Sequence, residues 1–306
     1  MSENPTHDHH FIPVFYLRNW VTAHQSRLVE YARRRNGPIT ARWTTPRGTG
    51  YQSYLYDATD GSASSLESSF MMPTDTKAAV SMRELLRPDR MPEWNRKLRS
   101  AWSRFIMSLL MRHPDDIAEL ARLVDDDWLN LTDEMRAAYS EAWQPGMPNT
   151  AEEYWDNNRG MRETARLTWL RGLIDNENVG RRINAMSWNV ANLDGARFRL
   201  LTSDKPVCMS TTIDGTNAYI MLPITPTRLF IGVGSNQTLR EIRRLTPNDL
   251  AAEVNREVVR NAGRFVFAAD TSQTRFVENH FGRSSTPSWM ARLAAKRAQD
   301  RLDKAA

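Results

Sequence analysis

Residues 9–20 read HHFIPVFYLRNW, two adjacent histidines followed by four aromatic rings. Neighbouring side chains point in different directions on any regular element, so His9 and His10 rarely bind one metal ion together. The rings bring enough apolar surface to anchor a core, and they belong to Phe11, Phe15, Tyr16 and Trp20. Two interpretations stay open: one histidine is a general base or metal ligand, or both make structural hydrogen bonds beside a packed aromatic cluster.

Short strands are predicted directly after this stretch. Leu28–Tyr31 and Ile39–Trp43 are rich in β-branched and aromatic residues, and they flank Asn36-Gly37-Pro38, a turn signal. Residues Tyr51–Tyr56 can add a third strand. The N-terminal part of the chain is therefore expected to form a small sheet.

From about residue 95 the apolar period becomes helical. One helical face is predicted to carry Leu98, Trp102, Phe105, Ile106 and Leu109. Pro114 fits the first turn of the next helix. Thr150 and Glu153 form a capping box that opens a helix running toward Ile174.

The C-terminal part returns to strands. The segments Arg197–Leu201, Ala218–Leu222 and Leu229–Val233 are short apolar or alternating runs between turns. Thr246 then caps a further helix that has Pro247 in its first turn. This order predicts an α+β fold, with N- and C-terminal strands in a sheet, a helical middle and a C-terminal helix. We expect one domain over residues 1–282, helical at about 95–190, and a peripheral helix or tail over residues 283–306.

The composition is that of a globular protein. The 306 residues are 41% apolar and 25% charged, with ten Trp and ten Phe for a core. The single cysteine, Cys208, excludes an intramolecular disulfide and a cysteine-rich zinc site. Residues 1–10 lack the pattern of a signal peptide, and the apolar run Phe105–Met111 is too short to span a bilayer. We therefore expect a cytoplasmic protein with no membrane partner.

Positive charge comes almost entirely from arginine, with 36 Arg and 5 Lys and a net charge of +5. Guanidinium groups match phosphate geometry, but the arginines are spread along the chain, as in a protein from a GC-rich gene. The densest run, Arg33-Arg34-Arg35, adjoins the Asn36-Gly37-Pro38 turn and fits a solvated loop. Nucleic-acid binding stays open on these residues and has little support from them.

Several short motifs resemble one bacterial family, catalogued as domain of unknown function 4238. The opening HHFIPVFYLRNW is similar to its His-His-x-x-Pro-x-x-x-Leu signature, and two later stretches, SDKP at residues 203–206 and PITP at residues 223–226, resemble its later motifs. Residues 105–114, ending in Arg112-His113-Pro114, resemble its helix that closes with Arg-x-Pro. The resemblance covers roughly residues 9–270. It also implies a second Glu after Glu67, where this chain has Asp75.

The Ser203-Asp204 pair is the second candidate site. A carboxylate at the end of a strand is a common general base or metal ligand. The alternative is that Asp204 satisfies nearby backbone N–H groups in an Asx-turn. Arg112 can hold an anion or cap the end of its helix. With Arg18 and Ser203, it completes the candidate binding residues.

Two classes of function remain. We expect a non-catalytic binding or regulatory module, in which these residues form a buried polar network between the N-terminal segment and the C-terminal sheet. The alternative is a metal-dependent hydrolase or nuclease in which His9 or His10 acts with Asp204 on a divalent cation. The sequence has no Walker A loop, no Gly-x-Ser-x-Gly and no His-Glu-x-x-His. It therefore does not decide whether the protein is an enzyme.

Overall fold

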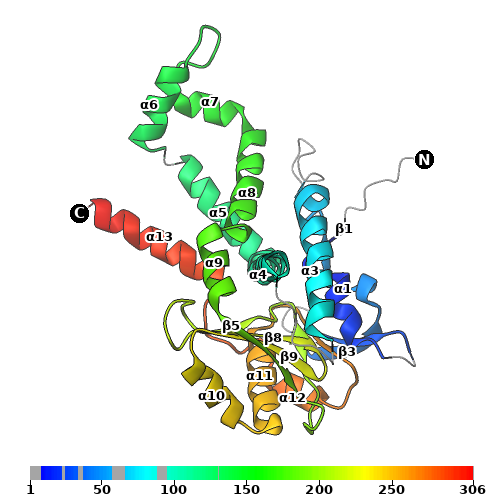
Figure 1. The fold of residues 1–306 in the computed structure, drawn as a ribbon. Coiled ribbons are helices and arrows are strands. Elements are labelled where there is room, and N and C mark those ends of the chain that lie inside the picture. Colours follow the sequence, from blue (N-terminus) through cyan, green and yellow to red (C-terminus); the bar gives the residue numbers. More distant parts are fainter. Residues whose placement is uncertain are drawn as a thin grey trace.

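A computed structural model gives the fold of the chain (Figure 1). The structure describes residues 8–22, 25–33, 37–56, 66–87, 95–129 and 131–305. The residues between these ranges include Arg34, Arg35 and Asn36, so the predicted arginine-rich turn lies outside the described residues.

Within the described ranges, the strands form three antiparallel sheets. The first pairs β1 (Asp8–His10) with β4 (Tyr51–Ser53). The second has the order β3 (Ile39–Thr44), β2 (Leu28–Arg33), β10 (Phe265–Ala268) and β6 (Thr202–Ser203). The third has the order β5 (Ser187–Asn192), β9 (Arg228–Val233), β8 (Tyr219–Thr225) and β7 (Cys208–Met209). The second sheet mixes N- and C-terminal strands, which confirms the predicted α+β class.

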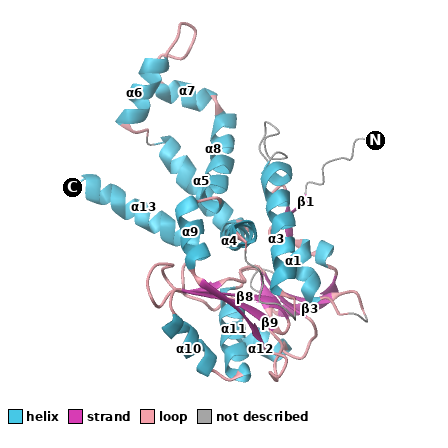
Figure 2. Cartoon of the chain, viewed as in Figure 1, coloured by secondary structure: helices cyan, strands magenta, loops and turns pink. Residues whose placement is uncertain are grey.

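Helices cover the sheets on both sides (Figure 2). Short turns near the N-terminus are α1 (Val14–Leu17), η1 (Arg18–Trp20) and η2 (Pro46–Gly48). The upper helices are η3 (Glu67–Met71), α3 (Met72–Leu85), α4 (Arg96–Met111), α5 (Pro114–Leu129), α6 (Asp133–Ala142), α7 (Ala151–Asn157), α8 (Arg159–Ile174) and α9 (Glu177–Ala185). The remaining helices are α10 (Asn236–Arg244), α11 (Pro247–Asn261), α12 (Thr274–His280) and α13 (Trp289–Ala305). Figure 1 shows α6 and α7 farthest from the sheets, and α10, α11 and α12 below them.

The main core lies where α4 meets the third sheet and the N-terminal stretch. Trp102, Phe105 and Ile106 on α4 are fully buried, as their shared helical face predicts. The ring of Trp102 packs edge-on against Phe230 of β9, and Phe105 packs against Tyr16. The predicted helix register of α4 is therefore correct.

Polar groups tie the N-terminal stretch to the C-terminal strands. The hydroxyl of Tyr16 donates to the carbonyl of Pro223 at 2.6 Å and lies 2.7 Å from the hydroxyl of Thr202. The indole of Trp20 donates to the carbonyl of Leu200 at 3.1 Å. These contacts join segments about 200 positions apart in sequence. The N-terminal stretch of residues 9–20 is thus held by hydrogen bonds against the C-terminal strands and the segment before them.

Two predicted elements differ in detail. Residues Arg197–Leu201 form no strand, because side chains rather than a neighbouring strand satisfy their backbone: Asn255 accepts from Leu201 N–H, and both Asn255 and Gln273 donate to the carbonyl of Arg199. The helix predicted from Thr150 to Ile174 breaks at Asn158, whose amide donates back to the carbonyl of Tyr154. Asparagine side chains compete with the helical backbone in this way.

Among the described residues, no helix combines the length and the apolar character that crossing a membrane requires.

Candidate functional site

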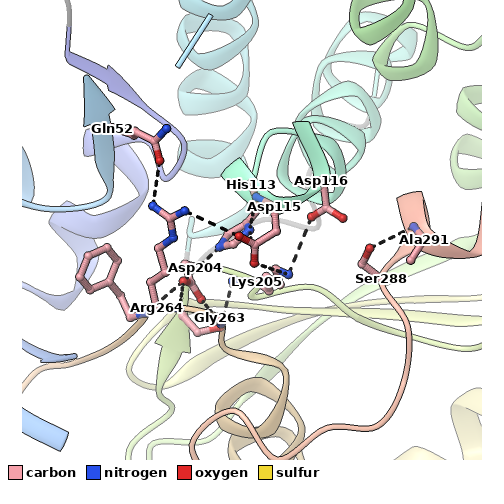
Figure 3. A network of polar contacts seen from close by, with 12 residues as sticks. Gln52, His113, Asp115, Asp116, Asp204, Lys205, Gly263, Arg264, Ser288 and Ala291 are labelled. Atoms are coloured by element: carbon pink, nitrogen blue, oxygen red, sulfur yellow. Dashed lines mark hydrogen bonds and ion pairs between the residues drawn. The ribbon is translucent and has the colours of Figure 1, made fainter. Parts of the chain in front are cut away.

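The Ser203-Asp204 strand end is buried and fully engaged. The carboxylate of Asp204 accepts hydrogen bonds from the backbone N–H groups of Gly263 at 2.9 Å, Phe265 at 3.0 Å and Arg264 (Figure 3). The Oδ2 atom of Asp204, which accepts from Arg264 and Phe265, also lies 3.3 Å from Nε2 of His113. Burial acts to raise the pKa of Asp204, but the hydrogen bonds from His113 and from the backbone donors outweigh it and lower the pKa. Asp204 thereby fixes the entry into β10.

His113 links this strand end to the helices. It lies between α4 and α5 and is 1% exposed. Its Nδ1 accepts from the backbone N–H of Asp115 at 3.2 Å, which leaves the Nε2 proton to point at Asp204. Phe11 packs edge-on against the imidazole, with ring centroids 5.6 Å apart. The N-terminal stretch therefore contacts the histidine ring that hydrogen-bonds to Asp204.

Gly263 stands where a side chain would crowd its neighbours. A Cβ at this position would lie 3.0 Å from two atoms of the His113 ring and 3.5 Å from the carboxylate of Asp204. Backbone and imidazole therefore pack closely at this part of the cavity wall, to which Gly263 belongs.

A cavity of about 850 Å³ lies behind that wall, within the usual size of ligand-binding cavities. Five separated segments line it: the ends of α4 and α5 that meet, residues 205–211, β8, α11 and the segment before α13. Its charged and hydroxyl groups include Asp116, Lys205, Tyr219, Glu257, Arg260 and Ser288. Groups of both charge signs thus face one hollow.

Lys205 and Asp116, two of the charged side chains that line the cavity, are partly and almost fully buried, respectively. The ammonium of Lys205 lies 3.6 Å from a carboxylate oxygen of Asp115 and 4.0 Å from one of Asp116 (Figure 3). Burial raises the pKa of Asp116 against the opposing charge of Lys205. Burial likewise raises the pKa of Glu257 and, with the charge of Glu257, raises the pKa of Tyr219 to about 12. Clustered groups with shifted pKa values are typical of ligand sites and active sites.

The predicted histidines lie on β1, away from this cavity's lining. His9 is 4% exposed, stacks on Tyr56 and accepts from the backbone N–H of Tyr56 at 3.2 Å. His10 lies 3.4 Å from the carbonyl of Arg47, and burial lowers its pKa. Gln52, the cross-strand partner of His9, accepts from Arg264 at 2.8 Å. β1 therefore borders the Asp204 network through its partner strand.

The three predicted binding residues lie in different environments. Arg18 is exposed on η1. Ser203 is buried, and its hydroxyl accepts from the backbone N–H of Lys205 at 3.2 Å. Arg112 is 1% exposed and pairs with Asp75 at 3.1 Å. The three side chains do not form one site.

Sequence reasoning passed over the groups that line the cavity. Lys205 stands inside the SDKP motif, and His113, whose ring lies against Gly263 of the lining, stands inside the sequence that closes α4, but neither stretch by itself indicates a cavity. Asp116 and Glu257 carry no local signal, since each lies on an ordinary amphipathic helix. Among the described residues, no three His, Cys, Asp or Glu side chains are grouped so that they could hold a metal ion.

Fold and cavity together define an α+β protein in which the two ends of the chain form the sheets and a helical middle covers them. The chain belongs to the family described as protein of unknown function (DUF4238), whose model matches residues 8–272. Comparison with curated proteins and with solved structures gives no significant match. The family match extends over the N-terminal stretch, the Asp204 network and most of the cavity wall.

Proposed function

We propose that the protein is a non-catalytic binding module that holds a small zwitterionic molecule in the cavity of about 850 Å³. The observation that carries this proposal is the convergence of Lys205, Asp116 and Glu257 on one hollow of ligand size. A molecule with one cationic and one anionic group pairs with both signs of charge at once. Nearby apolar side chains, among them Trp289, supply contact area.

The Asp204 network supports binding over catalysis. Three backbone donors and His113 already use the oxygens of Asp204, so its carboxylate serves to position Gly263, which lines the cavity. In the hydrolase alternative, the same carboxylate has to reach a divalent cation or a substrate. That role requires breaking contacts that hold β10 in place.

Thermal unfolding with small probes tests the proposal. γ-Aminobutyrate, putrescine and malate serve as zwitterionic, cationic and anionic probes, and a ligand that binds only the native state raises the melting temperature. We expect the largest rise with the zwitterion. Lys205→Ala and Glu257→Gln should each reduce that rise, whereas Lys77→Ala, on the exposed side of α3, should not. Equal shifts in all three variants would contradict a site in this cavity.

A further inference from the structure

A second cluster of buried polar groups surrounds Arg112, outside the cavity lining. Arg112 ends α4, and its side chain is 1% exposed. Its Nη1 atom donates to both oxygens of Asp75 on α3, at 3.1 and 3.3 Å. Within the described part of the chain, its Nε and Nη2 atoms have no hydrogen-bond partner.

The two unpartnered atoms are a matched pair. Nε–H and one Nη2–H point in parallel from the same edge of the guanidinium plane, the edge that binds carboxylate and phosphate groups with two hydrogen bonds. A buried guanidinium with donors left over destabilises the protein unless an acceptor reaches them. The ion pair with Asp75 leaves this edge open.

Two more polar groups, which the charge of Arg112 affects, are also buried without a hydrogen-bond partner among the described residues. Tyr56 is 2% exposed, and among the described residues its hydroxyl has no hydrogen-bond partner. The Oε2 atom of Glu67 is buried and likewise unpartnered there. Burial raises the pKa of both side chains, and the positive charge of Arg112 opposes the rise in each case. Both groups therefore lie within the field of the guanidinium.

The backbone at Glu67 is also unusual. Glu67 begins η3, a turn of π-helix that runs directly into α3. Such turns are rare in proteins and occur frequently at functional sites, where they re-aim side chains. Glu67 and Asp75 thus both lie in the first turns of one continuous helical segment.

We propose that Arg112, Tyr56 and Glu67 form a binding site for a small oxyanion, a carboxylate or a phosphate group, which the Nε–Nη2 edge of Arg112 holds with two parallel hydrogen bonds. The hydroxyl of Tyr56 donates a third hydrogen bond. The protonated carboxyl of Glu67 donates a fourth. Each of the unpartnered atoms then has a partner, and Asp75 keeps Arg112 in position from the opposite side.

Binding at this site depends on pH through Glu67. The groups that act on Glu67 are Arg112 from α4 and Asp75 from α3, and its pKa is raised by burial to about 7. His10 on β1 also lies in the field of Arg112, and burial and that positive charge both act to lower its pKa. When Glu67 loses its proton, an entering anion meets two carboxylates and one guanidinium. Affinity should fall by up to about tenfold per pH unit above 7, as for any ligand whose binding requires one proton.

The experiment measures thermal stabilisation of the full chain by sodium acetate and by inorganic phosphate, against sodium chloride at equal ionic strength. The two arms distinguish a carboxylate from a phosphate ligand. We expect at least one of them to raise the melting temperature beyond the chloride control. Acetate at pH 6 and pH 8 isolates Glu67, because the charge of the probe is constant over that range.

Conservative variants assign the effect to this site. Arg112→Lys keeps the charge beside Asp75 but removes the two-pronged edge, so binding should weaken at least about tenfold. Tyr56→Phe removes one unpartnered hydroxyl and should weaken binding while leaving the protein folded. Glu67→Gln should keep binding and abolish its pH dependence. Equal stabilisation of the parent protein and both the Arg112 and Tyr56 variants overturns the proposal, as does no stabilisation by either anion.

The outcome is independent of the cavity. Arg112, Tyr56 and Glu67 do not line it, so a negative result with acetate and phosphate leaves the zwitterion proposal standing, and the reverse also holds.

Discussion

At the scale of single residues, the same side-chain type has opposite roles in different surroundings. Tyr16 and Tyr56 are both fully buried tyrosines near the N-terminal stretch. Tyr16 donates to the carbonyl of Pro223, whereas the hydroxyl of Tyr56 has no partner among the described residues. A buried hydroxyl stabilises only when its hydrogen bond is made. This contrast separates a structural group from one that is available to a ligand.

Replacing each tyrosine by phenylalanine should therefore give opposite results. Tyr16→Phe leaves the carbonyl of Pro223 without its donor and should cost about 1–3 kcal/mol in the free energy of unfolding. Tyr56→Phe removes a desolvated group that gains nothing in the unliganded protein, so its stability should stay equal or rise. Denaturant titration without added anion measures both values. A loss of similar size in Tyr56→Phe would show that its hydroxyl does have a partner in solution.

Residue patterns predicted some site groups and missed others for a physical reason. His9, His10 and Asp204 are recognisable because their neighbours in the sequence make a motif. The sequence also singles out Glu67 and Asp75 as a spaced pair of acidic residues. Asp75 pairs with Arg112, and the charge of Arg112 acts on Glu67, but no motif in the sequence links either residue to Arg112. Lys205 and Glu257 line one cavity because segments far apart in the sequence pack together, among them β7 and α11, and no local pattern encodes that arrangement.

At the scale of elements, periodicity and capping residues predicted helices well. Thr150 and Thr246 accept from the backbone N–H groups of Glu153 and Asp249, as their positions before apolar runs indicate. The strand predicted over Arg197–Leu201 was wrong, because its backbone is satisfied by the distant side chains of Asn255 and Gln273. Helix signals are local, whereas a strand depends on what lies beside it.

The α4 face gives a stability prediction at this scale. Phe105 is fully buried, and it contacts the rings of Phe15, Tyr16 and Trp102. Phe105→Ala should cost about 3–5 kcal/mol, the usual range for a large ring removed from a packed core. Urea titration measures the change, and Phe198→Ala, at an exposed ring, is the matched control with little expected effect. An unchanged midpoint for Phe105→Ala would mean that the face is not buried in solution.

At the scale of the whole molecule, a few long-range polar contacts connect layers that the sequence separates. Asp204 joins the start of β10 to His113 at the junction of α4 and α5. Tyr16 and Trp20 join the N-terminal stretch to the C-terminal strands. The fold class could be predicted from the order of elements, but these long-range hydrogen bonds could not. It depends on which polar groups meet after the layers pack, and that information lies in no single segment.

The Asp204 connection allows a test that also decides between the two classes of function. Asp204→Ala strands three backbone N–H groups and His113 in a buried place, so it should cost about 3–5 kcal/mol. His10→Ala removes a part-exposed ring that makes a long hydrogen bond of 3.4 Å to Arg47 and packs against Tyr51, and it should cost less than about 1 kcal/mol. Both values come from thermal unfolding.

Hydrogen exchange on Asp204→Ala shows how far the effect extends. Because the carboxylate braces both layers, protection should fall in β10 and, together with it, in α4 and the start of α5. A catalytic carboxylate predicts the contrary, since groups selected for reactivity often contribute little to stability. An unchanged melting temperature in Asp204→Ala, together with stabilisation of the parent protein by Mg²⁺, Mn²⁺ or Zn²⁺ that this variant loses, would show that Asp204 binds a metal ion, as the hydrolase alternative requires, and would refute its structural role.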